Sequence, residues 1–156
     1  METREFEHTD EAGNSYRIER FENQVDVSGF EYDRQIKKSC EGCKNYKNNL
    51  SCPPHSPYFP DYIENAKAAA VICFHVPLDR FTTAPVREAY HAAFTVVRNL
   101  LVGELMEGRE AGYIVAGSGA CLICNPCAGA SDNAECRFPA KRLYSLESLG
   151  VNVVSL

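Results

Sequence analysis

The stretch KAAAVICFHVP, residues 67–77, is an uninterrupted apolar run that ends at a proline. A run of this length predicts a strand that is buried on both faces of a sheet. A segment with helical spacing, residues 84–107, separates it from a second short apolar run, GYIVAG, residues 112–117. Strand, helix and strand in this order predict two parallel strands joined by a right-handed crossover. The stretch therefore indicates an α/β sheet.

The segment between the two strands carries start and stop signals for a helix. Thr83 is placed as the N-cap, Pro85 falls in the first turn, and Gly108 ends the pattern. Apolar residues recur at helical spacing, and we expect them to pack on a sheet that contains residues 70–76 and 112–116. The members of this apolar face are Val86, Tyr90, Phe94, Val97 and Leu101.

The flanking segments extend the pattern. SYRIERF (15–21) and NQVDVSGF (23–30) alternate polar and apolar residues, which predicts two strands or one bent strand. AKRLYSLESL (140–149) predicts a helix, and VNVVSL (151–156) predicts a last strand. We expect one α/β domain over residues 1–156, with a small, open, mainly parallel sheet and flanking helices. Two cysteine-rich loops would lie at the carboxyl edge of the strands, where open α/β folds bind ligands.

Composition limits the compartment and the partners. The 156 residues include eight cysteines and carry a formal net charge of −5. The start, METREFEHTDEAG, lacks the basic and apolar parts of a secretory signal, and no window approaches the roughly 18 apolar residues of a membrane span. We expect a cytoplasmic protein that binds neither nucleic acid nor membrane. In a reducing cytoplasm, many cysteines indicate metal or redox chemistry rather than disulfides.

The densest cysteine motif is GSGACLICNPC, residues 117–127, directly after the second apolar run. Three thiolates spaced by two residues can hold three corners of one compact group, and a distant fourth completes a [4Fe-4S] site. Zinc competes because four thiolates also satisfy its tetrahedral preference, although structural zinc more often uses two separated C-x2-C knuckles. The distant fourth cysteine lies in CRFP, later than in the plain ferredoxin repeat. The set is Cys121, Cys124, Cys127 and Cys136.

A second motif, CEGCKNYKNNLSCPPHSP, provides Cys40, Cys43 and Cys52. With His55, these thiols would form a closed zinc site. The three cysteines could also hold a second cubane and leave its fourth iron to solvent, another residue or a substrate. The alternative for His55 is a polar loop histidine, since a single histidine is weak evidence of ligation. If the preceding strand is parallel to its neighbours, both motifs reach the same edge of the sheet.

The other cysteine and histidine side chains have simpler interpretations. Cys73 lies inside the first apolar run and is expected in the core, because free cysteine is among the most buried residue types. His75 is expected to be a core or edge residue of the same strand, and His91 a solvated residue on the polar face of the helix. Cations flank both motifs and would favour thiolates, or would simply be solvated. They are Lys37, Lys38, Lys44, Lys47, Arg137, Lys141 and Arg142.

The two motifs together resemble those of an uncharacterised prokaryotic family of predicted metal-binding proteins. In that family a C-x2-C-x2-Y…C-P-P element precedes G-x-C-x2-C-x2-C…C-R-x-P, and the match spans Cys40 to Val154. Leu50 departs from the family's usual aromatic residue before C-P-P, and relatives continue beyond the last strand. An unpaired last strand would favour a homodimer through that edge. The resemblance implies metal binding by all seven motif cysteines and makes Tyr46, Pro53, Pro54, Arg137 and Pro139 motif members.

Three classes of function follow from these motifs. The leading one is a small iron–sulfur protein that carries electrons to or from a redox partner protein or enzyme. The second is a small cluster enzyme, whose substrate would bind an open metal position at the three-cysteine set. The third is a zinc-stabilised interaction module. No Ser-His-Asp set or strong phosphate loop supports a hydrolase or a kinase.

Overall fold

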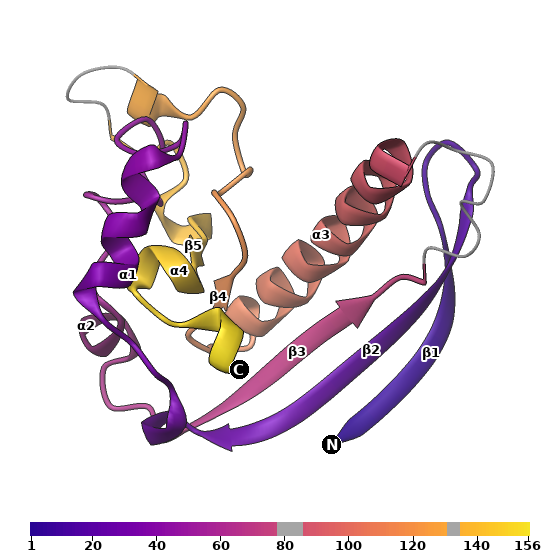
Figure 1. The fold of residues 1–156 in the computed structure, drawn as a ribbon, viewed down its shortest axis with the longest axis horizontal. Helices are drawn as coiled ribbons and strands as arrows, with labels where there is room; N and C mark the ends of the chain where they lie inside the picture. Colours follow the sequence, from indigo (N-terminus) through magenta and orange to yellow (C-terminus); the bar gives the residue numbers. More distant parts are fainter. Residues whose placement is uncertain (78–85, 131–134) are drawn as a thin grey trace. The chain divides into compact units, whose positions relative to one another are not determined.

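The computed structural model describes residues 1–77, 86–130 and 135–156, and the chain divides into two compact units (Figure 1). The first unit contains Met1–Val27 and Lys67–Glu104, and the second contains Ser28–Ala66 and Leu105–Leu156. No helix in the described ranges is both long and apolar enough to cross a membrane. The expectation of a single domain over the whole chain stays a prediction.

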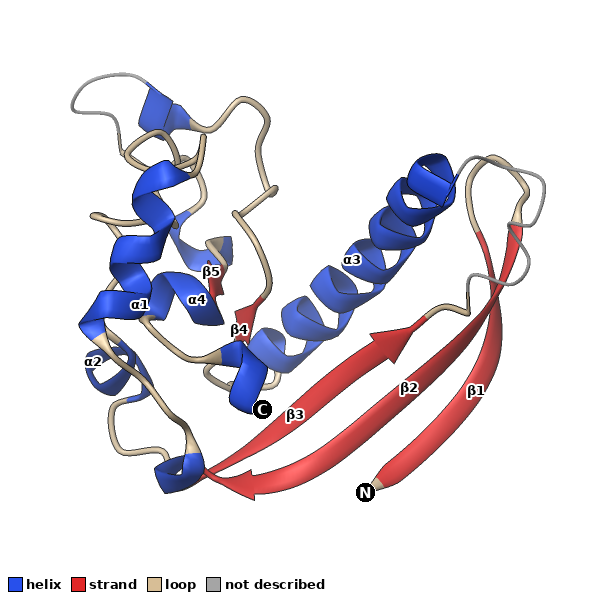
Figure 2. Cartoon of the chain, viewed as in Figure 1, coloured by secondary structure: helices blue, strands red, loops and turns tan. Residues whose placement is uncertain are grey.

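The first unit is built on an antiparallel sheet in the order β1-β2-β3 (Figure 2). The strands are β1 (Glu2–Thr9), β2 (Ser15–Asp26) and β3 (Ala68–His75). A tight turn joins β1 to β2, in which Asp10 accepts main-chain hydrogen bonds from Gly13 and Asn14. Gly13 has a φ of 86°, a conformation that glycine adopts without steric cost. The hairpin therefore sets the direction of both strands locally.

One face of this sheet is covered by α3 (Val86–Glu110). Ile18 is fully buried, and it packs with Ala93 and Val96 of the helix. The guanidinium of Arg20 on β2 binds both carboxylate oxygens of Glu104 on α3, at 2.8 and 3.1 Å. These two hydrogen bonds are directional, so they help to orient α3 on the sheet beside the apolar contact. The cluster is completed by Tyr16, Val76, Phe6, Phe74, Val97 and Leu100.

The second unit consists of short elements and long loops. Its helices are α1 (Arg34–Lys38), α2 (Phe59–Ile63) and α4 (Leu146–Leu149), and its two short strands, β4 (Ala116–Gly117) and β5 (Tyr144–Ser145), pair in parallel. Gly150 ends α4 with a φ of 97°, and a Cβ there would lie 2.9 Å from the Asp33 carbonyl oxygen. Leu149 and Val151, on either side of Gly150, are fully buried. Close packing around Gly150 therefore fixes α4 against the start of α1.

The predicted mainly parallel α/β sheet is wrong. The segments 67–77 and 112–117 belong to different sheets, because β3 pairs antiparallel with β2 while β4 pairs with β5. Phe74 of β3 packs against the cluster under α3, whereas Cys73, its neighbour on the opposite face, is exposed rather than in the core. Antiparallel pairing with β2 allows this one-sided burial, which a parallel sheet covered on both faces would not.

Other sequence predictions for these elements were partly right. The central helix exists, but Tyr90 and Phe94 of its predicted apolar face are 56% and 44% exposed. Residues 15–26 form one strand, and β1 was not predicted because charged residues interrupt its alternation. The predicted helix at 140–149 is reduced to α4. Thr83 and Pro85 lie outside the described residues.

The predicted last strand is also wrong. Val151 forms an isolated bridge with Tyr32, and Val153–Ser155 is a 3-10 helix. Asn152 caps this turn, because its side chain accepts a hydrogen bond from the Val154 N–H. The edge on which the expected homodimer rested is therefore not formed by these residues, and dimerisation itself stays a prediction.

Candidate metal centre

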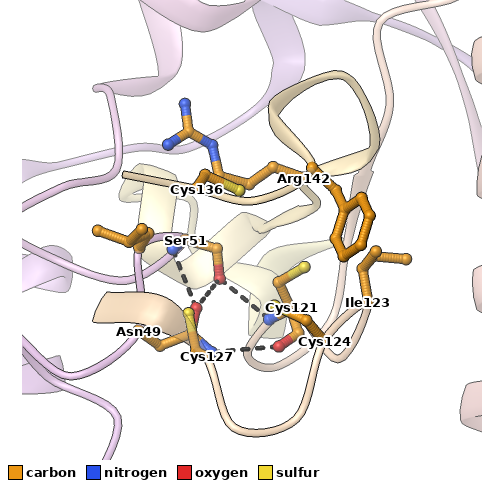
Figure 3. Close-up of a pocket in the computed structure, with 10 residues that line it drawn as sticks. Asn49, Ser51, Cys121, Ile123, Cys124, Cys127, Cys136 and Arg142 are labelled. Carbon is orange, nitrogen blue, oxygen red and sulfur yellow. Dashed lines mark hydrogen bonds between the residues drawn. The ribbon is translucent and has the colours of Figure 1, made fainter. Parts of the chain in front are cut away.

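The three cysteines of the GSGACLICNPC motif and the distant Cys136 line one pocket (Figure 3). Three of them follow β4 directly, and the fourth precedes the turn at Pro139–Lys141. All four are half-buried, so each thiol combines a fixed backbone with access to the pocket. They are Cys121, Cys124, Cys127 and Cys136, and the other lining residues are Asn49, Leu50, Ser51, Ile123, Phe138 and Arg142.

A closed ring of hydrogen bonds holds the main chain of Cys121 against the loop that carries Cys52. The Cys121 N–H donates to Ser51 Oγ at 3.0 Å, and this hydroxyl donates to Asn49 Oδ1 at 2.8 Å. Asn49 Nδ2 donates to the Cys121 carbonyl oxygen at 3.1 Å. Asn49 and Ser51 are 6% and 1% exposed, so the ring satisfies polar groups that would otherwise be costly to bury. It therefore fixes the main chain of the first cysteine of the four-cysteine set.

A close approach at Gly129 joins the same two loops. A Cβ at this position would lie 2.9 Å from Leu50 Cγ, 3.0 Å from Leu50 N and 3.2 Å from the Asn48 carbonyl oxygen. Two of these atoms belong to the backbone and cannot rotate away. Only glycine lets the chain after Cys127 lie this close to the loop that carries Asn48 and Leu50.

Replacing Gly129 by alanine should therefore force the two loops apart and destabilise the protein by about 1–3 kcal/mol, the usual cost of overpacking. Thermal unfolding of the metal-loaded protein measures the effect. Gly42→Ala is the matched control, since a Cβ at Gly42 would meet nothing within 4 Å although the residue adjoins Cys43. Equal stability of the two variants would contradict the close approach.

The three-cysteine set lies in the same unit, on successive tight turns. Cys40 belongs to a 3-10 helix, Ser39–Gly42, and its carbonyl oxygen accepts a hydrogen bond from the Cys43 N–H at 2.9 Å. The Cys52 N–H donates to the Asn49 carbonyl oxygen at 2.9 Å. Cys43 is exposed, and the other two thiols are half-buried. The loop that carries Cys52 therefore also carries the side chains that hold Cys121.

Two thiols of the three-cysteine set have raised pKa values. Burial raises the pKa of the Cys52 thiol, and the charges of Cys43, Cys40 and Cys127 raise it further. Burial likewise raises the pKa of Cys40, with added contributions from Cys43 and from Glu147. Metals bind thiolates, so a bound cation would have to offset the raised pKa values of both thiols. It would do so by stabilising the charged thiolates.

His55 has a partner other than the cysteines. Its side chain is exposed, and Nε2 lies 3.2 Å from the Lys47 carbonyl oxygen. This contact fits the interpretation of His55 as a polar loop histidine and does not favour it as the fourth ligand of the three-cysteine set.

Arg142 brings a buried donor to the four-cysteine pocket. Its Nε is buried and has no hydrogen-bond partner among the described residues, while its guanidinium lies 5.0 Å from the centre of the Tyr144 ring. In Figure 3 the Arg142 side chain runs beside Cys136. A buried unpaired N–H is costly unless an acceptor occupies the pocket. The guanidinium of Arg137, the other arginine near this motif, instead donates a hydrogen bond to the Pro126 carbonyl oxygen.

The donor set suits a soft metal or an iron–sulfur cluster. All eight cysteines are free thiols, and four of them surround a pocket that also receives a buried cationic donor. Thiolates select zinc, copper(I) or iron–sulfur clusters over harder cations. Across residues 1–77, 86–130 and 135–156, no three Cys, His, Asp or Glu side chains are already grouped as a single ion would need. The fit to a thiolate-bound centre therefore rests on the chemistry of the four cysteines and on the pocket that they share.

The remaining reactive residues lie in the first unit. Cys73 is exposed on β3, opposite Phe21 of β2. His75 is exposed at the end of β3, an edge strand of the sheet, and its Nδ1 lies 2.8 Å from the Glu19 carboxylate, so it takes the edge position of the predicted core or edge alternatives. His91 is exposed on α3, as predicted.

The second unit thus has the features of a cysteine-rich protein, in which loops bring several potential thiolate donors to one pocket. The chain belongs to the family described as predicted metal-binding protein (DUF2284), whose model matches residues 23–156. This match includes all seven motif cysteines and confirms the resemblance seen in the sequence. Searches of curated proteins and of solved structures found no match.

Sequence reasoning missed Asn49 and Ser51 as part of the site. The signal that could have indicated them is their position, since two small polar residues flank Leu50 directly before Cys52. Arg142 was recognised as a nearby cation, but its place in the pocket depends on the turn at Pro139–Lys141.

Proposed function

We propose that the protein binds a [4Fe-4S] cluster through Cys121, Cys124, Cys127 and Cys136. The single observation that carries the proposal is that all four cysteines line one pocket, together with the buried Nε of Arg142. A cluster with four thiolate ligands has net negative charge, so an unpaired donor from a cation is a suitable neighbour. Such a centre supplies one-electron chemistry when bound.

A second site at Cys40, Cys43 and Cys52 is part of the same proposal. The Asn49–Ser51 ring ties this loop to Cys121, so the chain holds the two sets next to each other. Zinc is the alternative at either site. Binding one zinc ion would require the sulfurs of the set that holds it to close in to about 2.3 Å from one point. In that case the protein would be a zinc-stabilised interaction module.

We propose electron transfer to or from a partner protein or enzyme as the role of the four-cysteine centre. Two large apolar side chains beside the pocket support a docking surface there, since Leu122 is 57% and Phe138 46% exposed. Phe138 also lines the pocket itself. Enzyme activity is the second candidate, because Cys43 is exposed and a three-thiol set leaves one metal position for a substrate.

Reduction of the anaerobically purified protein tests the redox role. An iron–sulfur cluster should give a broad visible absorption that bleaches on addition of dithionite and returns on reoxidation. A zinc protein has no such band, because zinc is redox-inactive. A metal-loaded protein whose spectrum is unchanged by reductant would contradict electron transfer and favour the interaction module.

A further inference from the structure

The buried Nε of Arg142 has no acceptor among the described residues, although the side chain lines the four-cysteine pocket and runs beside Cys136 (Figure 3). None of the ion pairs within residues 1–77, 86–130 and 135–156 involves its guanidinium. A buried N–H without an acceptor is costly, and in native proteins such a group calls for an explanation. The pocket therefore offers a hydrogen-bond donor that no described residue uses.

The pairing of β4 with β5 ties the segment of Arg142 to the cysteine run. Tyr144 of β5 lies opposite Ala116 of β4, and β4 leads directly into the run. On the other side, the main-chain N–H of Arg142 donates to the Pro139 carbonyl oxygen at 3.3 Å, which closes the turn that follows Cys136. The backbone on both sides of Arg142 is therefore fixed by main-chain hydrogen bonds.

A buried aromatic ring orients the side chain of Arg142. Its guanidinium lies 5.0 Å from the centre of the Tyr144 ring, within the range of a cation–π interaction. Tyr144 is 8% exposed, and its ring meets that of Tyr62 edge-on, with 5.2 Å between the ring centres. The Tyr62 hydroxyl donates to the Val115 carbonyl oxygen at 2.6 Å. The guanidinium therefore rests on a ring that is itself held by packing against a hydrogen-bonded neighbour.

Three other cations of the same unit have different environments. The guanidinium of Arg137 donates to a main-chain carbonyl oxygen of the cysteine run, and that of Arg109 donates to the Ala140 carbonyl oxygen at 2.6 Å. Lys141, the residue before Arg142, is exposed. Of these four cations, Arg142 is the one that lines the pocket.

We propose that Arg142 donates a hydrogen bond from Nε to a sulfur of the centre held by the four cysteines and raises the reduction potential of that centre. The inference rests on the proposed function and deepens it, since it requires a redox-active cluster at this site. Reduction adds one negative charge there, so a positive donor beside it stabilises the reduced form more than the oxidised form. The apolar side chains of Leu50 and Ile123 line the same pocket and limit screening of this charge by water. Arginine stays protonated at physiological pH, so the effect does not depend on titration of Arg142.

A redox titration of the anaerobically purified full chain, followed by its visible absorption, tests the proposal. Arg142→Met removes both the charge and the donor, and it should lower the ratio of reduced to oxidised centre at a fixed solution potential about tenfold, which for one electron is about 59 mV. Arg142→Lys keeps the charge but loses the planar guanidinium, so its potential should fall between those of Arg142→Met and the native protein. Lys141→Met is the matched control, because it removes the same charge from the adjacent, exposed position and should leave the potential unchanged.

The outcomes separate this inference from the proposed function. A native protein whose visible spectrum does not bleach with dithionite would contradict the redox centre itself, and with it the inference. If the native spectrum bleaches but Arg142→Met shifts the potential no more than Lys141→Met does, only the role of Arg142 is wrong. Iron and sulfide counts show whether each variant keeps its cluster. Loss of the cluster from both Arg142→Met and Arg142→Lys would also contradict this role, because Arg142 would then hold the loops together rather than set the potential.

Discussion

Replacing Cys124 by serine is expected to empty the four-cysteine centre and to cause the largest loss of stability of any single substitution considered. Cys124 lines the pocket from the middle of the C-x2-C-x2-C run, and its thiol is half-buried. Serine is close in size but offers a hard, protonated oxygen in place of a soft thiolate. Metal binding to such sites contributes on the order of 10 kcal/mol to folding, so losing one ligand removes a large part of it.

The measurement is metal content and thermal unfolding of the variant under anaerobic conditions. Cys73→Ser is the control, because Cys73 is exposed on β3 in the first unit and belongs to neither cysteine set. We expect the control to keep its metal and its unfolding temperature. A Cys124→Ser protein with full metal content and native stability would remove Cys124 from the ligand set.

Replacing Cys43 by alanine is expected to empty the three-cysteine site and to spare the four-cysteine centre. Cys43 is exposed, so the substitution creates no buried cavity and its effect reports on ligation alone. If the protein is an enzyme, the same variant should be inactive, because a site with an exchangeable position is where a substrate can reach the metal. Counting metal and sulfide per chain, with the visible spectrum of the remaining centre, measures the result.

The adjacency of the two sets makes this variant decisive. Ser51, directly before Cys52, accepts a hydrogen bond from the Cys121 N–H, and Asn49 donates one to the Cys121 carbonyl oxygen. Seven thiols in one unit could therefore surround one shared centre instead of two. If Cys43→Ala empties both sites together, the division into two centres is wrong.

Local signals in the sequence predicted individual elements but not the sheet. The central helix was recognisable from its repeated apolar residues, although small residues such as Ala93, rather than the aromatic Tyr90 and Phe94, form its buried face. Pairing between β2 and β3 joins residues about 50 positions apart, as in Phe21 with Cys73. No periodicity specifies such a partner, and the order of strand and helix favoured the wrong one.

Short elements were the hardest to predict. The segment at 112–117 looked like a strand, but the chain first leaves α3 through Gly112, with a φ of 89°, and only Ala116–Gly117 pair. The final VNVVSL has strand-like composition, yet the Asn152 cap turns it into a 3-10 helix. Here side-chain to main-chain hydrogen bonds overrode the residue preferences.

The candidate site was predictable to the extent that the cysteines themselves define it. Spacing alone indicated which thiols belong together, and the four that line the pocket are the set expected from the sequence. The supporting residues could not be predicted, because Asn49 reaches Cys121 over 72 positions and Arg142 enters the pocket only after the turn at Pro139–Lys141. Such contacts depend on the folded loops.

Iron and acid-labile sulfide, measured together on the anaerobically purified native protein, test the central claim most directly. We predict at least about four irons and four sulfides per chain, and about twice these values if the three-cysteine site also holds a cubane. Both should fall together in Cys124→Ser. Stoichiometric zinc without sulfide would contradict the iron–sulfur assignment, and a native protein that holds no metal under these conditions would contradict metal binding by the cysteine loops altogether.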